Sequence, residues 1–144
     1  MQARDIAQYL LVEFGDMSPM KLQKVLYYCQ AWSLVWDGKR LFDDPIEAWV
    51  KGPVVRDVWV QNRGATSIHT VNGDATAVVD RESIDTIRSV MKFYGQKTGQ
   101  ALSDLTHSEE PWIKAYSKRP NAIITRASIY DFYSAEANRL SVAP

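Results

Sequence analysis

Apolar residues recur every three or four positions along most of the chain, which is the pattern of amphipathic α-helices. Residues 3–14 show this spacing first, and a longer run over 20–36 shows it again. A glycine stands just after each run, as is usual at the end of a helix. Ser18 and Pro19 stand where a capping residue and a first helical residue are expected. The pattern therefore predicts two helices at the start of the chain.

The second predicted helix is apolar around nearly its whole circumference. Its main face carries Leu22, Val25, Leu26, Cys29, Ser33 and Trp36, and its other sides carry Tyr27, Tyr28, Ala31, Leu34 and Val35. Because such a helix has no side suited to water, we expect it at the centre of the domain, with the other elements packed around it. Cys29 is then a small buried apolar residue and not a reactive thiol.

The rest of the chain predicts shorter elements. Helices are indicated over residues 54–63, 81–95, 99–106 and 126–140, and one more short helix is capped by Ser108. Residues 67–71 and 75–79 have β-forming side chains and flank Asn72-Gly73, which is a strong hairpin signal.

These elements define a fold class. We predict a mainly α-helical protein with a single compact domain over residues 1–144, in which six or seven helices surround a buried central helix. One small peripheral β-hairpin completes the domain. The last residues, 141–144, are predicted to form a frayed tail.

Composition narrows the possible functions. The 17 Lys and Arg residues balance 17 Asp and Glu residues, so the chain lacks the positive excess on which non-specific nucleic-acid binding depends. Cys29 has no partner in the chain, which excludes an internal disulfide. No stretch approaches the roughly 20 apolar residues that span a bilayer, and the first residues lack the order of a signal peptide. We therefore expect a cytoplasmic protein whose partner is neither nucleic acid nor membrane.

Candidate catalytic chemistry is sparse. His69 and His107 are the only imidazole bases, and neither stands in a known nucleophile motif. The segment His107-Ser108-Glu109-Glu110 offers three metal donors, but acidic residues are also favourable in the first turn of a helix, and we prefer that interpretation. The glycines form no phosphate-binding loop. The sequence therefore predicts no catalytic residue, no metal and no cofactor.

Aromatic residues are the outlier of the composition. The chain has five Trp, seven Tyr and four Phe, and those of the central helix cannot all face inward. Core packing accounts for most of them, whereas Trp49, Trp59 and Trp112 stand next to turns and suit anchors of a protein–protein interface. The charges form segments of opposite sign, which fit either solvated helix faces or a protein partner.

Three blocks taken together resemble the Panacea domain family, also described as SocA-like or phage-associated GepA-like. Residues 21–32 (KLQKVLYYCQAW) resemble its first helix, 42–54 resemble its F-x-x-x-I-E-A-W-x-x-G-P-V segment, and 105–112 resemble its L-T-H-x-E-x-P-W block. The order and spacing also fit, with Cys29 and the 66–79 segment as the main departures. The matching residues to which we assign structural roles are Leu22, Gln23, Tyr27, Gln30, Gly52, Pro53, Thr106, His107, Glu109, Pro111 and Trp112.

Elementary chemistry gives these blocks physical roles. Gly52 permits a close backbone approach or a positive φ, and Pro53 fixes φ, so the chain is expected to reverse there. Thr106 and His107 are expected to end one helix, and Pro111 fits the first turn of the next. His107 is expected to pin this turn by a hydrogen bond to a backbone carbonyl or to a carboxylate such as Glu110.

The resemblance implies an antitoxin, which neutralises a cognate protein toxin encoded nearby by direct binding. Candidate toxin-binding residues are Tyr28, Trp32, Trp49, Trp59, Lys51 and Arg56. An adaptor that delivers the toxin to an ATP-driven protease is the alternative. An enzyme that uses His107 with Glu109 or Glu110, and a nucleic-acid-binding repressor, are the rivals from other classes. The oligomeric state stays open, because an apolar helix can be buried within one chain or between chains.

Overall fold

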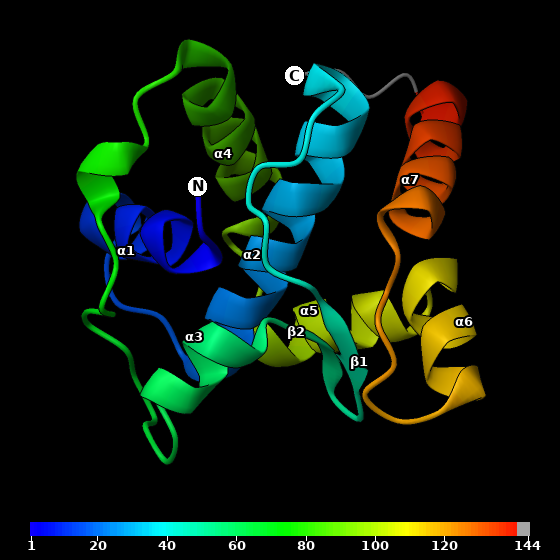
Figure 1. Cartoon of the computed structure of the whole chain (residues 1–144), viewed down its shortest axis with the longest axis horizontal. Helices are drawn as coiled ribbons and strands as arrows, with labels where there is room; N and C mark the ends of the chain where they lie inside the picture. The colour runs from blue at the N-terminus through cyan, green and yellow to red at the C-terminus, as the bar shows by residue number, and fades with distance from the viewer. Residues whose placement is uncertain (141–144) are drawn as a thin grey trace.

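The computed structural model describes residues 1–140, and the predicted frayed tail at 141–144 lies outside them. These residues form seven α-helices and one two-stranded antiparallel sheet (Figure 1), which confirms the predicted mainly α class. The elements are α1 Ala3–Phe14, α2 Pro19–Trp32, β1 Glu47–Trp49, β2 Gly52–Val54, α3 Arg56–Gln61, α4 Arg81–Tyr94, α5 Gly99–His107, α6 Glu110–Lys118 and α7 Arg126–Leu140. None of the helices within residues 1–140 is long and apolar enough to cross a membrane.

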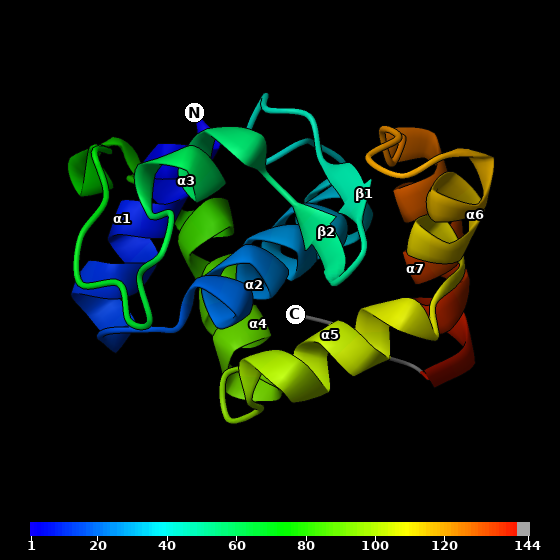
Figure 2. The same cartoon turned by 90° about the horizontal axis from the view of Figure 1, so that it is seen from below.

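Helix α2 lies at the centre of the fold, as predicted. It begins at Pro19, and the backbone N–H of Lys21 donates to the Ser18 Oγ (3.2 Å). Eleven of its fourteen residues are buried, and α1, α4, α5 and α7 all pack against it (Figures 1 and 2). The helix continues into a π-helical turn, Ser33–Asp37, which ends at Gly38 with a φ of 66°.

Two buried glutamines of α2 hold the irregular chain that follows it. The Gln30 Oε1 accepts from the backbone N–H groups of Leu41 (2.7 Å) and Phe42 (3.2 Å), and its Nε2 donates to the Phe42 carbonyl (2.9 Å). Two turns earlier, Gln23 makes the corresponding pair of bonds with the N–H and carbonyl of Val55. Because buried backbone groups need partners, these side chains fix the segment on both sides of the hairpin.

The hairpin formed by β1 and β2 is joined by a third extended segment. Its register pairs Glu47 with Val54 and Trp49 with Gly52. On the other edge of β1, residues 121–124 run alongside, and Ala48 both donates to the Ala122 carbonyl (2.8 Å) and accepts from the Asn121 N–H (2.7 Å). The chain just before α7 thus covers the edge that β1 would otherwise expose.

The hairpin predicted at 67–79 is wrong, because the chain there is irregular and includes only a single 3₁₀ turn, Ala75–Ala77. Gly73 packs against the backbone of Arg4, and the N–H of Asp74 donates to Asp5 of α1 (2.9 Å). The Asn-Gly pair therefore serves a close contact with α1 instead of a two-residue turn. Contacts distant in sequence have overridden a local signal.

Most predicted helix boundaries lie within two residues of the observed ones. Asp80 caps α4 as expected, through a bond from the N–H of Ser83 (3.0 Å). The cap of α6 is Glu109 and not Ser108, whose hydroxyl donates to the Leu105 carbonyl instead (2.7 Å).

Candidate functional site

The alternation of side chains along β1 creates an exposed group next to the core. Ile46 and Ala48 are buried, whereas Glu47 and Trp49 point to the opposite side and are partly exposed. This two-residue period is what an extended strand with one buried face requires. Trp49 is therefore displayed at the surface by the same strand that anchors the hairpin.

Two tryptophans and two arginines lie in contact on this side. The rings of Trp49 and Trp59, from β1 and α3, meet edge to face with centroids 4.9 Å apart. The Arg56 Cζ lies 5.3 Å from the Trp49 centroid, and the Arg63 Cζ lies 4.9 Å from the Trp59 centroid. Such cation–π contacts hold the guanidinium groups over the ring faces. We call Glu47, Trp49, Arg56, Trp59 and Arg63 the Trp49–Trp59 surface.

The Glu47 carboxylate fixes the orientation of side chains in this surface. Its Oε1 accepts from the indole N–H of Trp49 (2.9 Å) and from the Arg56 Nη2 (2.9 Å). Partial burial acts to raise the pKa of Glu47, but these bonds and the charges of Arg56 and Arg119 outweigh it and leave the pKa below its ordinary value. The carboxylate thus stays ionised and fixes one Trp and one Arg in a set geometry.

The hairpin that carries Trp49 is fastened to three helices. The Trp112 indole of α6 donates to the Trp49 carbonyl (2.8 Å), and Ser103 of α5 donates to the Lys51 carbonyl (2.6 Å). From α2, the buried Lys24 Nζ donates to the Pro53 carbonyl (3.0 Å). A surface held in this way is preorganised, so a partner need not pay much entropy to order it.

Lys24 passes directly beneath Gly52. A Cβ at position 52 would lie 2.6 Å from the Lys24 Cε and 2.8 Å from the Thr106 Oγ1, and the φ of Gly52 is +115°. Both the space and the backbone conformation therefore require glycine, as the sequence suggested. Burial lowers the pKa of Lys24 from 10.5 to about 7, because the ammonium group is removed from water.

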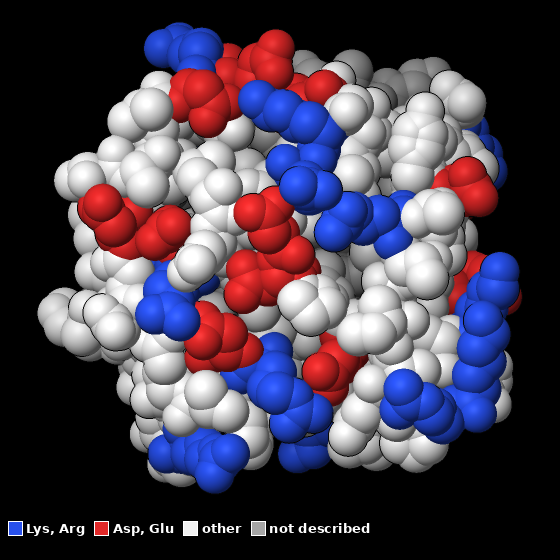
Figure 3. Space-filling view, in the orientation of Figure 1, with Lys and Arg blue, Asp and Glu red and all other residues white. Residues whose placement is uncertain are grey.

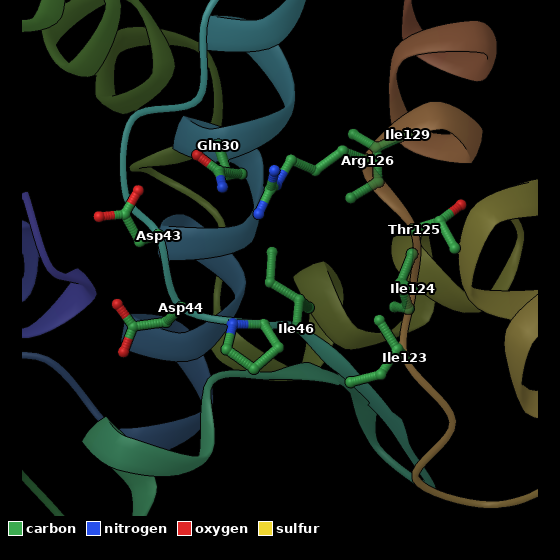
Figure 4. Close-up of a pocket in the computed structure, with 10 residues that line it drawn as sticks. Gln30, Asp43, Asp44, Ile46, Ile123, Ile124, Thr125, Arg126 and Ile129 are labelled. Atoms are coloured by element: carbon green, nitrogen blue, oxygen red, sulfur yellow. The ribbon is translucent and has the colours of Figure 1, made fainter.

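A groove of about 210 Å³ opens beside this surface, between residues 43–46 and the start of α7. Its apolar lining consists of Pro45, Ile46, Ile123, Ile124 and Ile129. Figure 4 shows Asp43 and Asp44 on one side, and Arg126 extending from the other side toward Gln30 of α2. We call it the Arg126 groove. It adjoins the Trp49–Trp59 surface, because Ile123 at its mouth pairs with Glu47 across the sheet edge.

Charges of both signs surround this region. Figure 3 shows acidic groups near the middle of the face and basic groups above, to the right of and below them. Acidic and basic groups are therefore interspersed over the face that Figure 3 shows.

A second polar cluster lies inside the fold. The hydroxyls of Tyr28 and Tyr133 donate to the Glu109 Oε1 (2.6 and 2.7 Å), and the Tyr27 hydroxyl lies 3.1 Å from that of Tyr133. Burial raises the pKa of Glu109 above its ordinary value, although the two hydroxyl bonds act in the opposite direction. The cluster joins α2 and α7 to the loop between α5 and α6. Its hydrogen bonds connect residues of the cluster to one another, so it is part of the structure of the domain.

Comparison with known protein families identifies the domain. The model of the family described as "Antitoxin SocA-like, Panacea domain" matches residues 22–113, which is more than half of the chain. The chain belongs to this family. Comparisons with curated proteins and with solved structures gave no significant match.

Most Panacea-block residues shape the interior of the domain. Leu22, Gln23, Tyr27, Gln30, Gly52, Pro53, Thr106 and Pro111 are all buried. Thr106 and His107 end α5, and Pro111 lies in the first turn of α6, as predicted.

The structure divides the predicted toxin-binding residues of the Panacea domain. Trp49, Trp59 and Arg56 come together on one surface, and Lys51 is exposed at the hairpin turn. The two remaining candidates are Tyr28 and Trp32. Their assignment to the surface is wrong, because both side chains are buried: Tyr28 stacks on Tyr94 (4.0 Å between centroids), and the Trp32 indole donates to the Tyr94 hydroxyl (2.9 Å).

His107 does not make the predicted bond to Glu110. Its ring packs against that of Trp112, with centroids 4.2 Å apart, and its Nε2 is buried without a hydrogen-bond partner among residues 1–140. Glu109, its other proposed partner, turns inward to the tyrosines. In the part of the chain that the structure describes, no three potential metal ligands lie together.

Sequence reasoning missed Glu47, Arg63 and Arg126. Two of them had a usable signal: Glu47 precedes Trp49 by two residues and so shares its face of the strand, and Arg63 follows Trp59 by four residues, which is one helical turn. Arg126 had none, because its approach to residues 43–46 is set by the tertiary fold.

Proposed function

We propose that this Panacea domain neutralises a cognate toxin protein by direct binding, and that it does so without catalysis. The Trp49–Trp59 surface is the observation that carries the proposal. Trp and Arg are among the residue types that most often dominate binding energy at protein interfaces. Here two half-buried Trp rings meet edge to face, and an exposed Arg lies over each of them.

Exposed apolar residues also follow Trp49 and Trp59 directly in the chain. Val50 at the hairpin turn is 67% exposed and Val60 on α3 is 41% exposed. Lys51 stands beside Val50 and is exposed as well. An aromatic centre surrounded by aliphatic and charged groups has the composition of an interface, with an apolar middle and a polar rim.

Co-expression tests this proposal. The product of the small open reading frame beside the gene should arrest growth alone, and the wild-type Panacea domain should restore growth and co-purify with it. Trp59→Ala should weaken binding at least tenfold, because it removes one ring and the seat of Arg63. Phe93→Ala is the matched control, since Phe93 is an exposed aromatic of α4 (62%) outside this surface. Equal rescue by both variants would contradict the assignment of the surface.

Toxin levels separate binding from proteolytic delivery. Direct inhibition predicts that the amount of toxin in the cell is unchanged when it is neutralised, with or without ATP-driven proteases. If the toxin disappears only in cells that contain such a protease, the adaptor function replaces direct inhibition.

A further inference from the structure

We infer that the toxin contacts this face through an acidic segment, and that an aliphatic or aromatic side chain of that segment enters the Arg126 groove. The inference rests on the proposed function and names the chemistry of the partner. It follows from three properties of the groove and its surroundings: the ion pairs of the nearby charged residues, the apolar floor, and the acidic residues on the side opposite Arg126.

The carboxylates of this face already have partners within the chain. The Asp43 Oδ1 accepts from the Arg40 Nε (2.6 Å), and the Asp44 Oδ1 accepts from the backbone N–H of Ala3 (2.8 Å). Both oxygens of Glu47 are engaged as well: Oε1 accepts from Trp49 and Arg56, and Oε2 accepts from the Arg56 Nε (3.3 Å). By the ion-pair criterion, Asp43 and Glu47 are thus neutralised by Arg40 and Arg56, and among residues 1–140 Asp44 is the carboxylate of this group without an ion pair.

The cations of the same face are available. Within residues 1–140, no carboxylate lies within ion-pair distance of Lys51, Arg63, Arg119 or Arg126. Arg126 lines the groove, Arg63 rests on Trp59, and Arg119 acts on the pKa of Glu47 and so lies near the hairpin. Four positive charges without intramolecular ion pairs make the face complementary to an acidic segment.

The floor of the groove selects an apolar side chain. Ile46, Ile124 and Ile129 are buried, and Ile123 is 48% exposed at its mouth. A cavity of about 150 Å³ lined by aliphatic side chains holds one benzene molecule. The Arg126 groove, at about 210 Å³, therefore has room for one large side chain and not for a helix.

The opposite wall argues against a nucleic acid as the occupant. Figure 4 shows Asp43 and Asp44 on the side of the groove opposite Arg126, with their carboxylate groups directed away from it toward Arg40 and the N–H of Ala3. A phosphate backbone carries a charge at every nucleotide and would place some of them against these carboxylates. A protein segment can place its acidic groups beside Arg126 and Lys51 and leave the neighbourhood of Asp43 and Asp44 uncharged.

Binding measurements with the purified toxin test the charge assignment. Arg126→Glu should weaken binding at least tenfold at 50 mM salt and less at 300 mM. Arg88→Glu, an exposed arginine of α4, is the matched control and should change the dissociation constant less than twofold. Unchanged melting temperatures would show that both variants are folded. Equal affinity of the two variants would overturn the inference and leave the proposed function standing, whereas absence of toxin binding to the wild type would contradict the proposed function itself.

Photocrosslinking identifies the segment directly. A benzoylphenylalanine in place of Ile123 at the mouth of the groove should crosslink to a toxin peptide that contains more Asp and Glu than Lys and Arg and at least one large apolar residue. A crosslinked peptide with a basic excess would overturn the inference. Competition for the toxin by a 20-nucleotide oligothymidine at equal molar concentration would also overturn it.

Discussion

The polar residues of α2 and those of the Trp49–Trp59 surface differ in what their hydrogen bonds do. Gln23, Lys24 and Gln30 are at most 4% exposed and bond to backbone groups of the chain that follows α2. Arg56 and Arg63 are exposed and contact other side chains. A buried backbone group that loses its partner costs about 1–3 kcal/mol, whereas an exposed ion pair contributes about 0–1 kcal/mol.

This difference separates two roles within the domain. The α2 residues specify the fold, because without them the buried backbone groups on both sides of the hairpin lose their hydrogen-bond partners. The surface residues add little to folding and are free to serve recognition. Substitutions in the two regions should therefore divide between stability and toxin binding, and four experiments test that division.

Gln30→Ala should have the largest effect. It leaves the N–H groups of Leu41 and Phe42 and the carbonyl of Phe42 without their partner, and we expect a loss of about 3 kcal/mol or more in the free energy of unfolding. Urea denaturation measures it. Gln100→Ala, at an exposed position of α5, should change the same quantity by less than about 0.5 kcal/mol. If Gln30→Ala lost no more stability than Gln100→Ala, water would have to satisfy the backbone groups that the Gln30 amide binds.

Gly52→Ala should have the second largest effect, a loss of about 2–3 kcal/mol in the free energy of unfolding. The new Cβ would collide with Lys24 and Thr106, and the residue would have to keep a positive φ. Gly38→Ala is the matched control. Gly38 also has a positive φ (+66°), but a Cβ there meets nothing within 4 Å, so only the backbone cost of about 1 kcal/mol is expected. Equal losses in thermal or urea unfolding would mean that the close approach at Gly52 relaxes freely.

The sequence predicted the helices well because their signals are local. The Ser18-Pro19 start, the Asp80 cap and the glycine after α1 act within one turn of the helix that they delimit. The hairpin was placed at 67–79 because Asn72-Gly73 is also a local signal, but the contact with α1 decides that region. The true strands have only three residues each, and the short apolar-polar alternation over residues 46–50, although followed by the expected reversal at Gly52-Pro53, was not assigned to a strand.

The candidate site was predicted in part for the same reason. Trp49, Trp59 and Arg56 were selected by residue type, and the structure shows that they meet. Tyr28 and Trp32 were selected by the same criterion and are buried, because the fold surrounds α2 on every side. The Arg126 groove joins residues some 80 positions apart, so periodicity and spacing had no access to it.

Lys24 makes the stability of the fold depend on pH. Its pKa is about 7 in the folded protein against 10.5 as the ordinary value, so the unfolded chain binds a proton that the folded protein lacks between these values. Stability should therefore rise with pH in this window, by at most about 1.4 kcal/mol per pH unit. Below pH 7 both states are protonated, and this contribution no longer changes.

Lys24→Met should remove this rise. Urea unfolding of the wild type and the variant at pH 7 and pH 9 measures the difference, and we expect the wild type to gain up to about 2 kcal/mol relative to the variant. Lys92→Met, at an exposed position of α4, controls for the loss of a positive charge as such. Parallel curves for wild type and Lys24→Met would show that the ammonium group is solvated in the folded protein.

Arg63→Ala should have the smallest effect on folding and sharpens the comparison most. Arg63 is exposed and its one marked contact is the cation–π contact with Trp59, so the free energy of unfolding should change by less than about 0.5–1 kcal/mol. Toxin binding should nevertheless weaken several-fold, because the guanidinium holds the ring and faces the acidic segment. A double-mutant cycle with Trp59→Ala measures the coupling in both quantities. Coupling in binding but hardly in stability would show that the contact serves recognition. Coupling of equal size in both would place Arg63 with the fold-specifying residues of α2.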